Sequence, residues 1–507
     1  MAAVLKTAAG TGAGTSLNAV TDSGIVAPPD RIARTQARLV HGLKIEDVPP
    51  HIALRARHLM LDAFGCALAS RREEYAARYF AAVCDLTGVG ANSPNATRDG
   101  RGVIGYAARL PMRDAALMNG VLAHGLDYDD THMAGVIHLT VSVLPAVLAL
   151  GGERNASGRD VLTAYIAGLE AGARIASVVK SGLHAHGFHP TGVVGAFASA
   201  LAAGKLIGLN VNQLVQAQGI ALSLASGSLQ FIEDGSWTKR LHPGWAAQAG
   251  ITAAVMASHG IVAPRAPYEG RFGFYRIYLG QDEHARIDPA LALAGLTDVD
   301  SDMPHVTRWE LENIAVKPFP MCHFVHASID AAIALRAQGV NVAGVRSIEV
   351  RVPAGVVPAV CEPQDKKRRP QSDYDAKFSL PYAVVSGLMR GRLGLAELTP
   401  QAFQDPAACA LMDRVTYAVD SASTFPQHYT GEVRVTLLDG RTVTHRESIN
   451  RGHAERPLSN DDVVEKYRAN ATLNFSAAHA EAVRTEVLAL DELKSIRTLE
   501  DLLAREP

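Results

Sequence analysis

The sequence lacks the cysteine patterns of disulfide-rich and zinc-binding proteins. Its five cysteines are far apart and form no CxxC pair. Such spacing argues against a zinc knuckle or a disulfide framework and is typical of a reducing compartment. No basic segment followed by an apolar core of signal length opens the chain. We therefore expect a cytoplasmic protein.

Long hydrophobic runs and a surplus of one charge are missing as well. The longest apolar runs, such as Val193–Gly204, fall short of the roughly 20 residues that a membrane helix needs. Lysine and arginine number 49 against 51 acidic residues, a formal net charge of −2. The overall charge of a nearly neutral chain does not attract it to nucleic acid or to an anionic membrane, so we expect neither as a partner.

Several motifs of common enzymes are also absent. The sequence contains no GxGxxG after a predicted strand, no Walker loop, no GxSxG and no HExxH. Nucleotide chemistry and serine hydrolysis are therefore disfavoured.

The residue patterns predict a multi-domain fold with a large, discontinuous all-α domain and a smaller α+β lid domain. Helical spacing of apolar residues predominates up to about residue 312, whereas strand-like alternation over 347–357 and an Asp439-Gly440 hairpin signal within 432–447 mark the α+β segment. We expect a ligand site in the cleft between the two. The predicted division is a disordered extension (1–30), the first helical part (31–312), the lid (313–456) and a helical return segment (457–507).

The stretch 119–138 is the first candidate for chemistry. It combines three acids and three histidines with an apolar, alanine-rich run: Asp127, Asp129, Asp130, His124, His132 and His138. If the stretch starts helical, His124, Asp127, Asp130 and Thr131 share one face. Burying that face is costly unless its groups are paired. The alternative is a solvated acidic loop.

Four further places could supply partners. His189 precedes a helix, and Lys239 and Arg240 precede an apolar helix over 246–258, where cations oppose the helix dipole but suit an anionic substrate. The segment 317–326 carries a lysine and two histidines at the expected domain junction, and 375–382 opens the next helix. For each place the alternative is an ordinary turn, junction loop or helix start.

Six segments in order resemble the landmarks of one family. They are LDYDDTH (126–132), FHPTGVVGAF (188–197), TKRLHPGWAAQAGI (238–251), YEGRFGF (268–274), KPFPMCHFVHASIDAA (317–332) and AKFSLPYAV (376–384). Over about residues 30–490 the chain is similar to the 2-methylcitrate dehydratase, cis-aconitate decarboxylase and iminodisuccinate epimerase family, also called MmgE/PrpD. The resemblance implies a helical domain with an α+β lid, a homodimer, and cofactor-independent chemistry on a small polycarboxylate, with no metal.

The resemblance also implies the site residues. The expected catalytic residues are Asp127, His138, His189, Lys239, His323 and Tyr382, and the expected substrate-binding residues are Thr131, Lys317 and Arg240. Three departures stand out. Leu-Thr follows His138 where many members have Pro-Ser, and Cys322 falls where the decarboxylase branch has histidine. The dehydratase branch typically carries an asparagine in place of one aspartate of the first motif, whereas this chain has both Asp129 and Asp130.

These residues suit proton transfer at a carbon beside a carboxylate. Lys239 and Lys317, with Arg240 as a weaker candidate, would stabilise an enediolate-like intermediate. The histidines would move protons, Asp127 would orient a neighbour, and Tyr382 would donate a hydrogen bond. Dehydration of the 2-methylcitrate type is the preferred prediction. Epimerisation and decarboxylation within the family, a metal-dependent hydrolase using Asp127, Asp129, Asp130 and the histidines, and a non-catalytic binding protein remain the alternatives.

Overall fold

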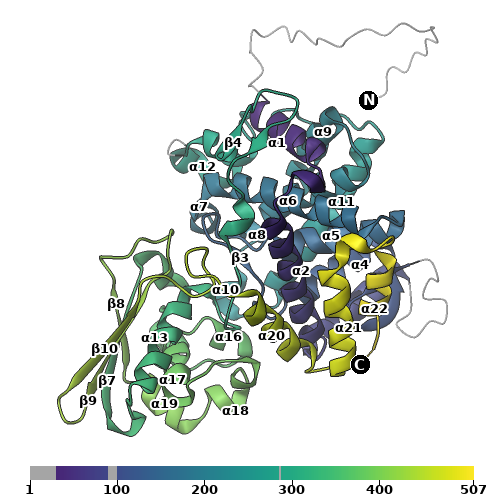
Figure 1. The fold of residues 1–507 in the computed structure, drawn as a ribbon. Helices are drawn as coiled ribbons and strands as arrows, with labels where there is room; N and C mark the ends of the chain where they lie inside the picture. The colour runs from purple at the N-terminus through teal and green to yellow at the C-terminus, as the bar shows by residue number, and fades with distance from the viewer. Residues whose placement is uncertain (1–29, 89–99, 285–286, 507) are drawn as a thin grey trace, which may run out of the picture.

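The computed structural model describes residues 30–88, 100–284 and 287–506. The expected N-terminal extension, residues 1–30, lies outside the described residues except for its last residue. The described chain is a mostly helical, multi-domain structure, as predicted, with one four-stranded sheet in its C-terminal half (Figure 1).

One hydrophobic core holds the helical part of the molecule. It draws residues from 32–316 and again from 458–503. The helices are α1 (Arg31–Gly42), α2 (Pro50–Ser70), α3 (Glu74–Thr87), α4 (Met112–His124), α5 (Thr140–Arg154), α6 (Gly158–Val179), α7 (Gly182–Ala185), α8 (Pro190–Leu206), α9 (Val211–Leu224), α10 (Phe231–Asp234), α11 (Thr238–Ser258), α12 (Phe274–His284), α20 (Asn460–Ala471), α21 (Ala477–Leu488) and α22 (Arg497–Leu503). Short strand pairs connect them: β1 (Arg101–Val103) with β2 (Tyr106–Leu110), β3 (Thr131–His132) with β6 (Ile314–Ala315), and β4 (Leu296–Thr297) with β5 (His305–Val306).

A second core holds the sheet-containing part, which we define as residues 319–447. Its strands β7 (Val345–Val352), β8 (Val415–Val419), β9 (Gly431–Leu437) and β10 (Thr442–Glu447) form one sheet in the order β10-β9-β7-β8, with only β7 and β8 parallel. Its helices are α13 (His326–Ala337), α14 (Val357–Val360), α15 (Gln364–Arg368), α16 (Asp373–Lys377), α17 (Leu380–Arg390), α18 (Pro400–Phe403) and α19 (Pro406–Met412). Helix α13 packs on β9, β10 and α17.

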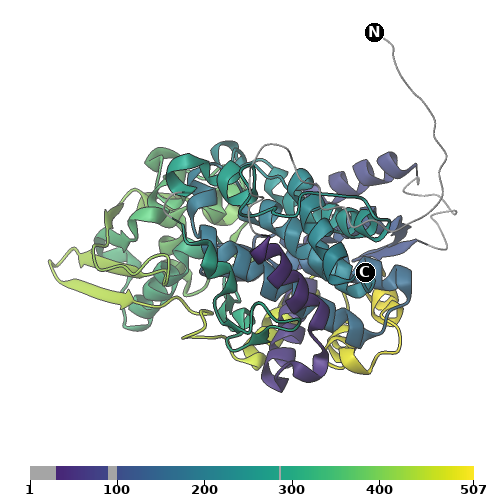
Figure 2. The same cartoon turned by 90° about the horizontal axis from the view of Figure 1, so that it is seen from above.

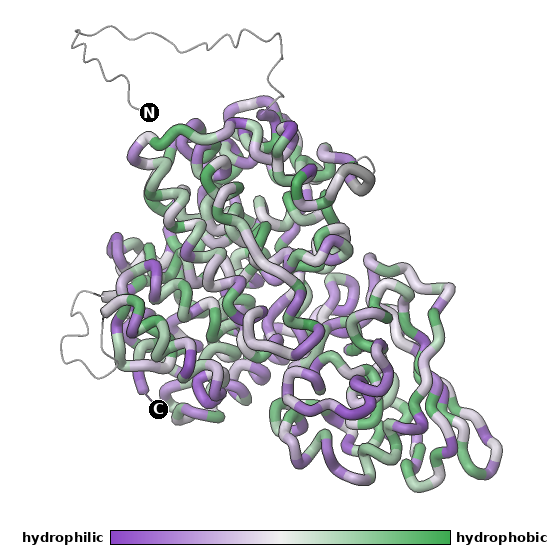
Figure 3. Tube along the Cα trace, turned by 180° about the vertical axis from the view of Figure 1, so that it is seen from behind, coloured by the Kyte–Doolittle hydropathy of each residue, from purple (hydrophilic) through white to green (hydrophobic). Residues whose placement is uncertain are grey.

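The two parts lie beside each other, and the C-terminal helices return to the helical part. Figure 1 shows α20 next to α2, and these two helices are in extensive contact. From above, the sheet-containing part projects from one side of the helical part (Figure 2). Figure 3 shows hydrophobic and hydrophilic residues mixed along both parts, as expected of amphipathic elements.

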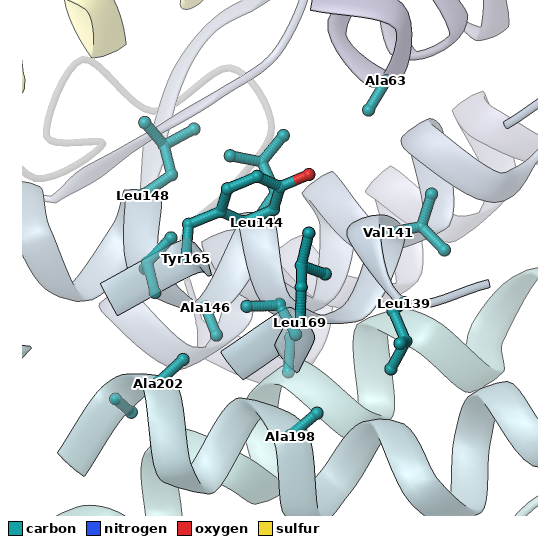
Figure 4. Close-up of a cluster of buried hydrophobic side chains, with 14 of the residues drawn as sticks. Ala63, Leu139, Val141, Leu144, Ala146, Leu148, Tyr165, Leu169, Ala198 and Ala202 are labelled. Atoms are coloured by element: carbon teal, nitrogen blue, oxygen red, sulfur yellow. The ribbon is translucent and has the colours of Figure 1, made fainter. Parts of the chain in front are cut away.

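Small residues allow the helices of the larger core to approach closely. In Figure 4 Ala198 and Ala202 of α8 lie opposite Ala146 of α5 and Leu169 of α6. A Cβ added at Gly120 of α4 would stand 2.5 Å from the Cα of Gly244 on α11, so these two backbones touch. Helix α6 is long and apolar enough to span a membrane by composition, but 94% of its most apolar window is buried inside the protein.

Local chemistry fixes two helix starts and one predicted turn. The side chain of Ser157 accepts a hydrogen bond from the backbone N–H of Asp160 at the start of α6. Asn210 and Gln213 form a reciprocal capping box at α9. The Asp439-Gly440 hairpin is confirmed as the β9–β10 turn, with Gly440 at a φ of 90°.

Three predicted elements differ from the structure. The strand expected over 347–357 ends at Val352, because the following residues turn into short helices. Helix α11 begins at Thr238, so Lys239 lies inside its first turn rather than before it. The helical face expected across 124–131 was wrong, since α4 ends at His124 and Asp127 adopts a left-handed backbone with a φ of 52°.

Candidate active site

A cavity of about 550 Å³ of empty space is lined by both parts of the molecule. The helical part supplies residues from the 127–138 loop, the start of α8, the α10 region and α11, and the sheet-containing part supplies residues near 322–324, 359, 378 and 429. Seven of the nine predicted site residues line it: Asp127, Thr131, His138, His189, Lys239, Lys317 and His323. The structure therefore brings together residues that are almost 200 positions apart in the sequence.

The β3–β6 pair explains why Lys317 meets Asp127. Thr131 pairs with Ala315 in an antiparallel ladder, so the residues just before β3 lie opposite those just after β6. The ammonium of Lys317 donates to both the carboxylate Oδ1 and the carbonyl oxygen of Asp127, each at 2.8 Å. This short ladder therefore sets the register of the cationic side of the cavity.

Asp127 is shared by two lysines. Helix α11 places the Lys239 ammonium 2.9 Å from the same Oδ1 atom that Lys317 contacts. Burial by itself would raise the pKa of Asp127, but the two ammonium groups hold that pKa well below its usual range. Within the described residues its second oxygen, Oδ2, has no hydrogen-bond partner. Asp127 therefore stays ionised and fixes two cations beside the cavity.

Asp129 bridges two histidines. Its Oδ1 lies 2.9 Å from His124 Nδ1, and its Oδ2 lies 3.1 Å from His138 Nδ1. His138 Nδ1 also lies 2.7 Å from the carbonyl oxygen of Asp130, an acceptor only. His138 therefore carries a proton on Nδ1, and its Nε2, 4.0 Å from Asp127 Oδ1, remains for proton transfer.

Asp130 differs from Asp127 and Asp129 in its hydrogen-bond partners and in its protonation. It is fully buried and accepts a hydrogen bond from Thr140, whose hydroxyl also contacts Tyr165. Burial raises the pKa of Asp130 to about 8, with a further contribution from the charge of Asp129. The carboxyl is therefore protonated near neutral pH. It lies outside the lining of the cavity.

His189 directly precedes α8, as the sequence predicted, and its side chain makes no capping hydrogen bond. Its Nδ1 lies 3.0 Å from Nδ1 of His242, so one of the two rings donates to the other. Burial, the neighbouring His242 and Lys239 hold the pKa of His189 well below its usual range, and burial also lowers the pKa of His242 to about 4. His189 is therefore a neutral base whose orientation depends on His242.

The sequence reasoning missed His242 although a signal was present. It follows Lys239 by three residues in the same helix, and residues at that spacing share one helix face. Because α11 presents Lys239 to the cavity, the same face carries His242 toward His189.

His323 and two missed residues form a second group of hydrogen-bonding side chains. Asn450 accepts the backbone N–H of Tyr429 with its Oδ1, which turns its Nδ2 toward His323 Nε2 at 2.9 Å. The ring proton of His323 therefore lies on Nδ1. Neither this Nδ1 nor the hydroxyl of Tyr429 has a partner among the described residues, and both residues line the cavity. No sequence motif marks Tyr429 or Asn450.

Cys322 lines the cavity beside His323. Burial, together with the charge of Asp127, raises the pKa of its thiol. The thiol is therefore neutral and a weak nucleophile. His323 is the more suitable of the two for proton transfer, in line with the prediction that chose it.

Tyr382 does not reach the cavity. Its hydroxyl donates to the carbonyl oxygen of Glu397 and accepts from Arg390 at 3.2 Å, inside the core of the sheet-containing part. The expected catalytic role of Tyr382 has no support in this geometry, because the start of α17 faces away from the cavity. The tyrosine that lines the cavity is Tyr429.

Arg240 is turned away as well. Its Nε donates to the carbonyl oxygen of Gly125 at 2.8 Å, and the guanidinium lies over the rings of Tyr75 and Tyr374. Adjacent residues of a helix point about 100° apart, so Lys239 and Arg240 cannot both face the cavity. The expected substrate-binding role of Arg240 is therefore a structural one in this arrangement.

Among the described residues, side chains with metal-ligand chemistry lie in two places, and the first place holds two overlapping groups, one of which consists of His124, His138 and His189. Ligand atoms of His124, Asp127, Asp129 and His138 lie within 4.8 Å of one another. However, the two ammonium groups on Asp127 would repel a divalent cation there. The second place lies at the edge of the sheet-containing part and holds His428, His453 and Glu455.

Family models and known proteins match most of the chain in sequence. The model of the MmgE/PrpD N-terminal domain matches residues 34–286, and that of the MmgE/PrpD C-terminal domain matches residues 319–492. The chain is 29% identical over 487 residues to cis-aconitate decarboxylase of Mus musculus, with 93% of each chain covered. It is 29% identical over 488 residues to the enzyme of the same name from Homo sapiens, covering 93% of this chain and 94% of that one. The identity to cis-aconitate decarboxylase of Aspergillus terreus is 28% over 490 residues, with 91% and 93% covered.

Proposed function

Since the chain belongs to the MmgE/PrpD family, we propose that it is a cofactor-independent lyase that decarboxylates a small di- or tricarboxylate. Its relatives from Mus musculus and Aspergillus terreus are named cis-aconitate decarboxylases, and a decarboxylase is a lyase. The observation that carries the proposal is the pairing of two buried ammonium groups with neutral, buried histidines in one cavity.

The lysines suit the charge that develops during such a reaction. When a carboxylate leaves as carbon dioxide, the electron pair of the broken C–C bond passes through a neighbouring double bond onto a remaining carboxylate. Lys239 and Lys317 would stabilise this enediolate-like group, because fixed cations in a cavity sheltered from water act strongly on developing charge. Asp127 holds both ammonium groups in place before the substrate arrives.

The histidines suit the proton transfer that completes the reaction. The histidine that is neutral in the free protein takes up a proton from solvent when the anionic substrate binds, gives that proton to the carbon beside the remaining carboxylate, and is left neutral again. The lowered pKa of His189 makes its protonated form a strong acid, and its contact with His242 holds the ring in place. His138, fixed by Asp129, is the second candidate.

Dehydration is the second candidate reaction. It removes a proton beside a carboxylate and expels a hydroxyl group two carbons from that carboxylate. The neutral donors Tyr429 and His323 favour it, because their unpartnered hydroxyl and N–H could hydrogen-bond a leaving hydroxyl. The 2-methylcitrate type of dehydratase predicted from the sequence belongs here.

Substitution of Lys317 tests the proposal. In Lys317→Met, kcat/KM for the best polycarboxylate of a panel is expected to fall by about 10²–10³, because one stabilising cation is lost. The exposed Lys494 supplies the control, and Lys494→Met is expected to keep full activity. Full activity in both Lys317→Met and His189→Gln would refute the assignment of the site.

A further inference from the structure

Five apolar side chains of the cavity lining, together called its apolar side here, have no part in the reaction described above. Leu229, Phe231 and Ile232 come from the segment that forms α10, and Phe324 and Phe378 come from the sheet-containing part. Phe231 is buried and packs edge-on against His189, with ring centroids 6.0 Å apart. The apolar side therefore begins directly beside the proposed acid–base group.

The charged groups of the cavity are few. Among the described residues that line it, the cations with a permanent charge are Lys239 and Lys317, and the anion is Asp127. Both lysines contact the same carboxylate oxygen, so the cavity offers one net positive charge to a ligand. Arg240, the other cation expected there, is turned toward Tyr75 and Tyr374.

Two further polar groups of the lining are neutral donors. Tyr429 and His323 present a hydroxyl and an Nδ1–H without partners among the described residues. Burial raises the pKa of Tyr429 and lowers that of His323 well below its usual range, so neither carries a charge near neutral pH. Such donors orient a carboxylate or a hydroxyl but do not neutralise an additional anion.

We propose that the substrate is a dicarboxylate that bears an uncharged, apolar substituent where a tricarboxylate such as cis-aconitate has its third carboxylate. This inference rests on the proposed lyase function and narrows its substrate class. One carboxylate lies against the lysines, the second accepts from the neutral donors, and the substituent packs against Phe231, Ile232 and Phe378.

Charge balance is the physical reason. When a histidine of the cavity takes up a proton as the anionic substrate binds, that proton and the one net positive charge of the two lysines and Asp127 balance a dianion, and the reaction then consumes the proton. A trianion would leave one further negative charge unpaired against aromatic and aliphatic side chains, and burying an unpaired charge is strongly unfavourable. The apolar substituent instead gains free energy by leaving water.

An alkyl group in place of the central carboxylate of the substrate leaves the reaction chemistry unchanged. In cis-aconitate the central carboxylate neither leaves nor accepts the electron pair when the CH₂-linked carboxylate is lost. In a 3-alkylpent-2-enedioate the same C–C bond breaks, its electron pair reaches the other carboxylate, and a histidinium protonates the carbon beside it. In a 3-alkyl-3-hydroxypentanedioate the same skeleton supports dehydration.

A matched pair of acids tests the inference. The wild-type protein is given cis-aconitate and 3-isopropylpent-2-enedioate, in which an isopropyl group of similar shape replaces the central carboxylate. Citrate and 3-hydroxy-3-isopropylpentanedioate form the second pair, for dehydration. We expect kcat/KM and affinity to favour the isopropyl acids by about tenfold or more.

A charge placed on the apolar side should reverse the preference. Ile232 is half-buried, so Ile232→Lys can place a third ammonium near the cavity without unfolding the core. This variant is expected to shift the ratio of kcat/KM values toward the tricarboxylates by about tenfold. Ile333→Lys, an equally half-buried position on α13 outside the cavity, is the control and should leave the ratio unchanged.

The outcomes separate this inference from the proposed function. A wild-type preference for cis-aconitate or citrate that Ile232→Lys does not increase would overturn the substrate class and leave the lyase proposal standing. If calorimetry shows that no acid of either pair binds and none is converted, the proposed function fails and the inference fails with it.

Discussion

At the scale of single residues, three aspartates within four positions have three different environments. Asp127 is ionised between two ammonium groups, Asp129 holds two histidines, and Asp130 is protonated against Thr140. Their burial is nearly identical, so the difference comes from their partners alone. Substitution by asparagine, which keeps the shape and removes the charge, should therefore have different effects.

Asp127→Asn is expected to be strongly destabilising. Near neutral pH it leaves two buried ammonium groups without their carboxylate, a loss of about 3–5 kcal/mol in the free energy of unfolding. The low pKa of Asp127 means that its stabilising contribution is present above the unfolded value of about 4 and is lost as pH falls through the folded value. Urea denaturation at pH 7.5 measures the loss.

Asp130→Asn is the matched control with the opposite sign. With its pKa raised to about 8, Asp130 binds a proton in the folded protein that the unfolded chain releases above pH 4. Its ionisation therefore favours unfolding as pH rises from about 4 to 8, and the asparagine variant should gain stability relative to wild type over that window. An equal loss in the two variants at pH 7.5 would contradict these assignments.

At the scale of elements, α11 is the helix on which the site depends. It carries Lys239 and His242 on one face. Its Gly244 touches α4, because a Cβ added at Gly244 would stand 2.1 Å from the carbonyl oxygen of Leu117. The contact sets the distance between the helix bearing Lys239 and the loop bearing Asp127.

Gly244→Ala is expected to destabilise the protein by about 1–3 kcal/mol and to lower activity at the same time, because overpacking shifts α11. Gly344→Ala is the control, since its Cβ would meet nothing within 4 Å and its φ is not positive. Thermal melting and kcat/KM of the two variants would be compared. A Gly244→Ala protein with wild-type melting temperature and activity would show that the close approach is dispensable.

Helix starts and turns could be predicted from the sequence better than the direction of single side chains. The caps at Ser157 and Asn210 and the hairpin at Gly440 follow from local chemistry, which acts within a few residues. Tyr382 and Arg240 are of suitable type, but their direction depends on how α17 and α11 pack, which local patterns do not encode. Tyr429 reaches the cavity, and Asn450 reaches His323, only through the folding of the chain, so no spacing rule could have found them.

At the scale of the whole molecule, buried histidines link stability to pH. Burial lowers the pKa of nine described histidines: His58, His124, His184, His189, His242, His323, His326, His453 and His479. In the unfolded chain each would take up a proton below about pH 6.5. The unfolded state then binds more protons than the folded state, so the free energy of unfolding decreases as pH falls.

We therefore expect the melting temperature to drop steeply between pH 7 and about 4, with each histidine contributing up to about 1.4 kcal/mol per pH unit. Burial raises the pKa values of seven described acids, which act in the opposite direction but are fewer: Asp62, Glu73, Asp114, Asp130, Glu269, Asp330 and Glu500. Calorimetric scans at pH 7.5, 6.5 and 5.5 would measure the trend. A melting temperature that rises or stays constant over this range would mean that the histidines are not buried as described.

The central claim is that this cavity moves protons at a carbon beside a carboxylate. Proton NMR of the purified protein in deuterated buffer tests it most directly, with cis-aconitate, citrate, 2-methylcitrate, iminodisuccinate and the two isopropyl dicarboxylates as substrates. We predict that at least one acid acquires deuterium beside a carboxylate or loses carbon dioxide or water, and that Lys317→Met abolishes the change. If every acid keeps its spectrum unchanged and none shows line broadening, the claim is contradicted.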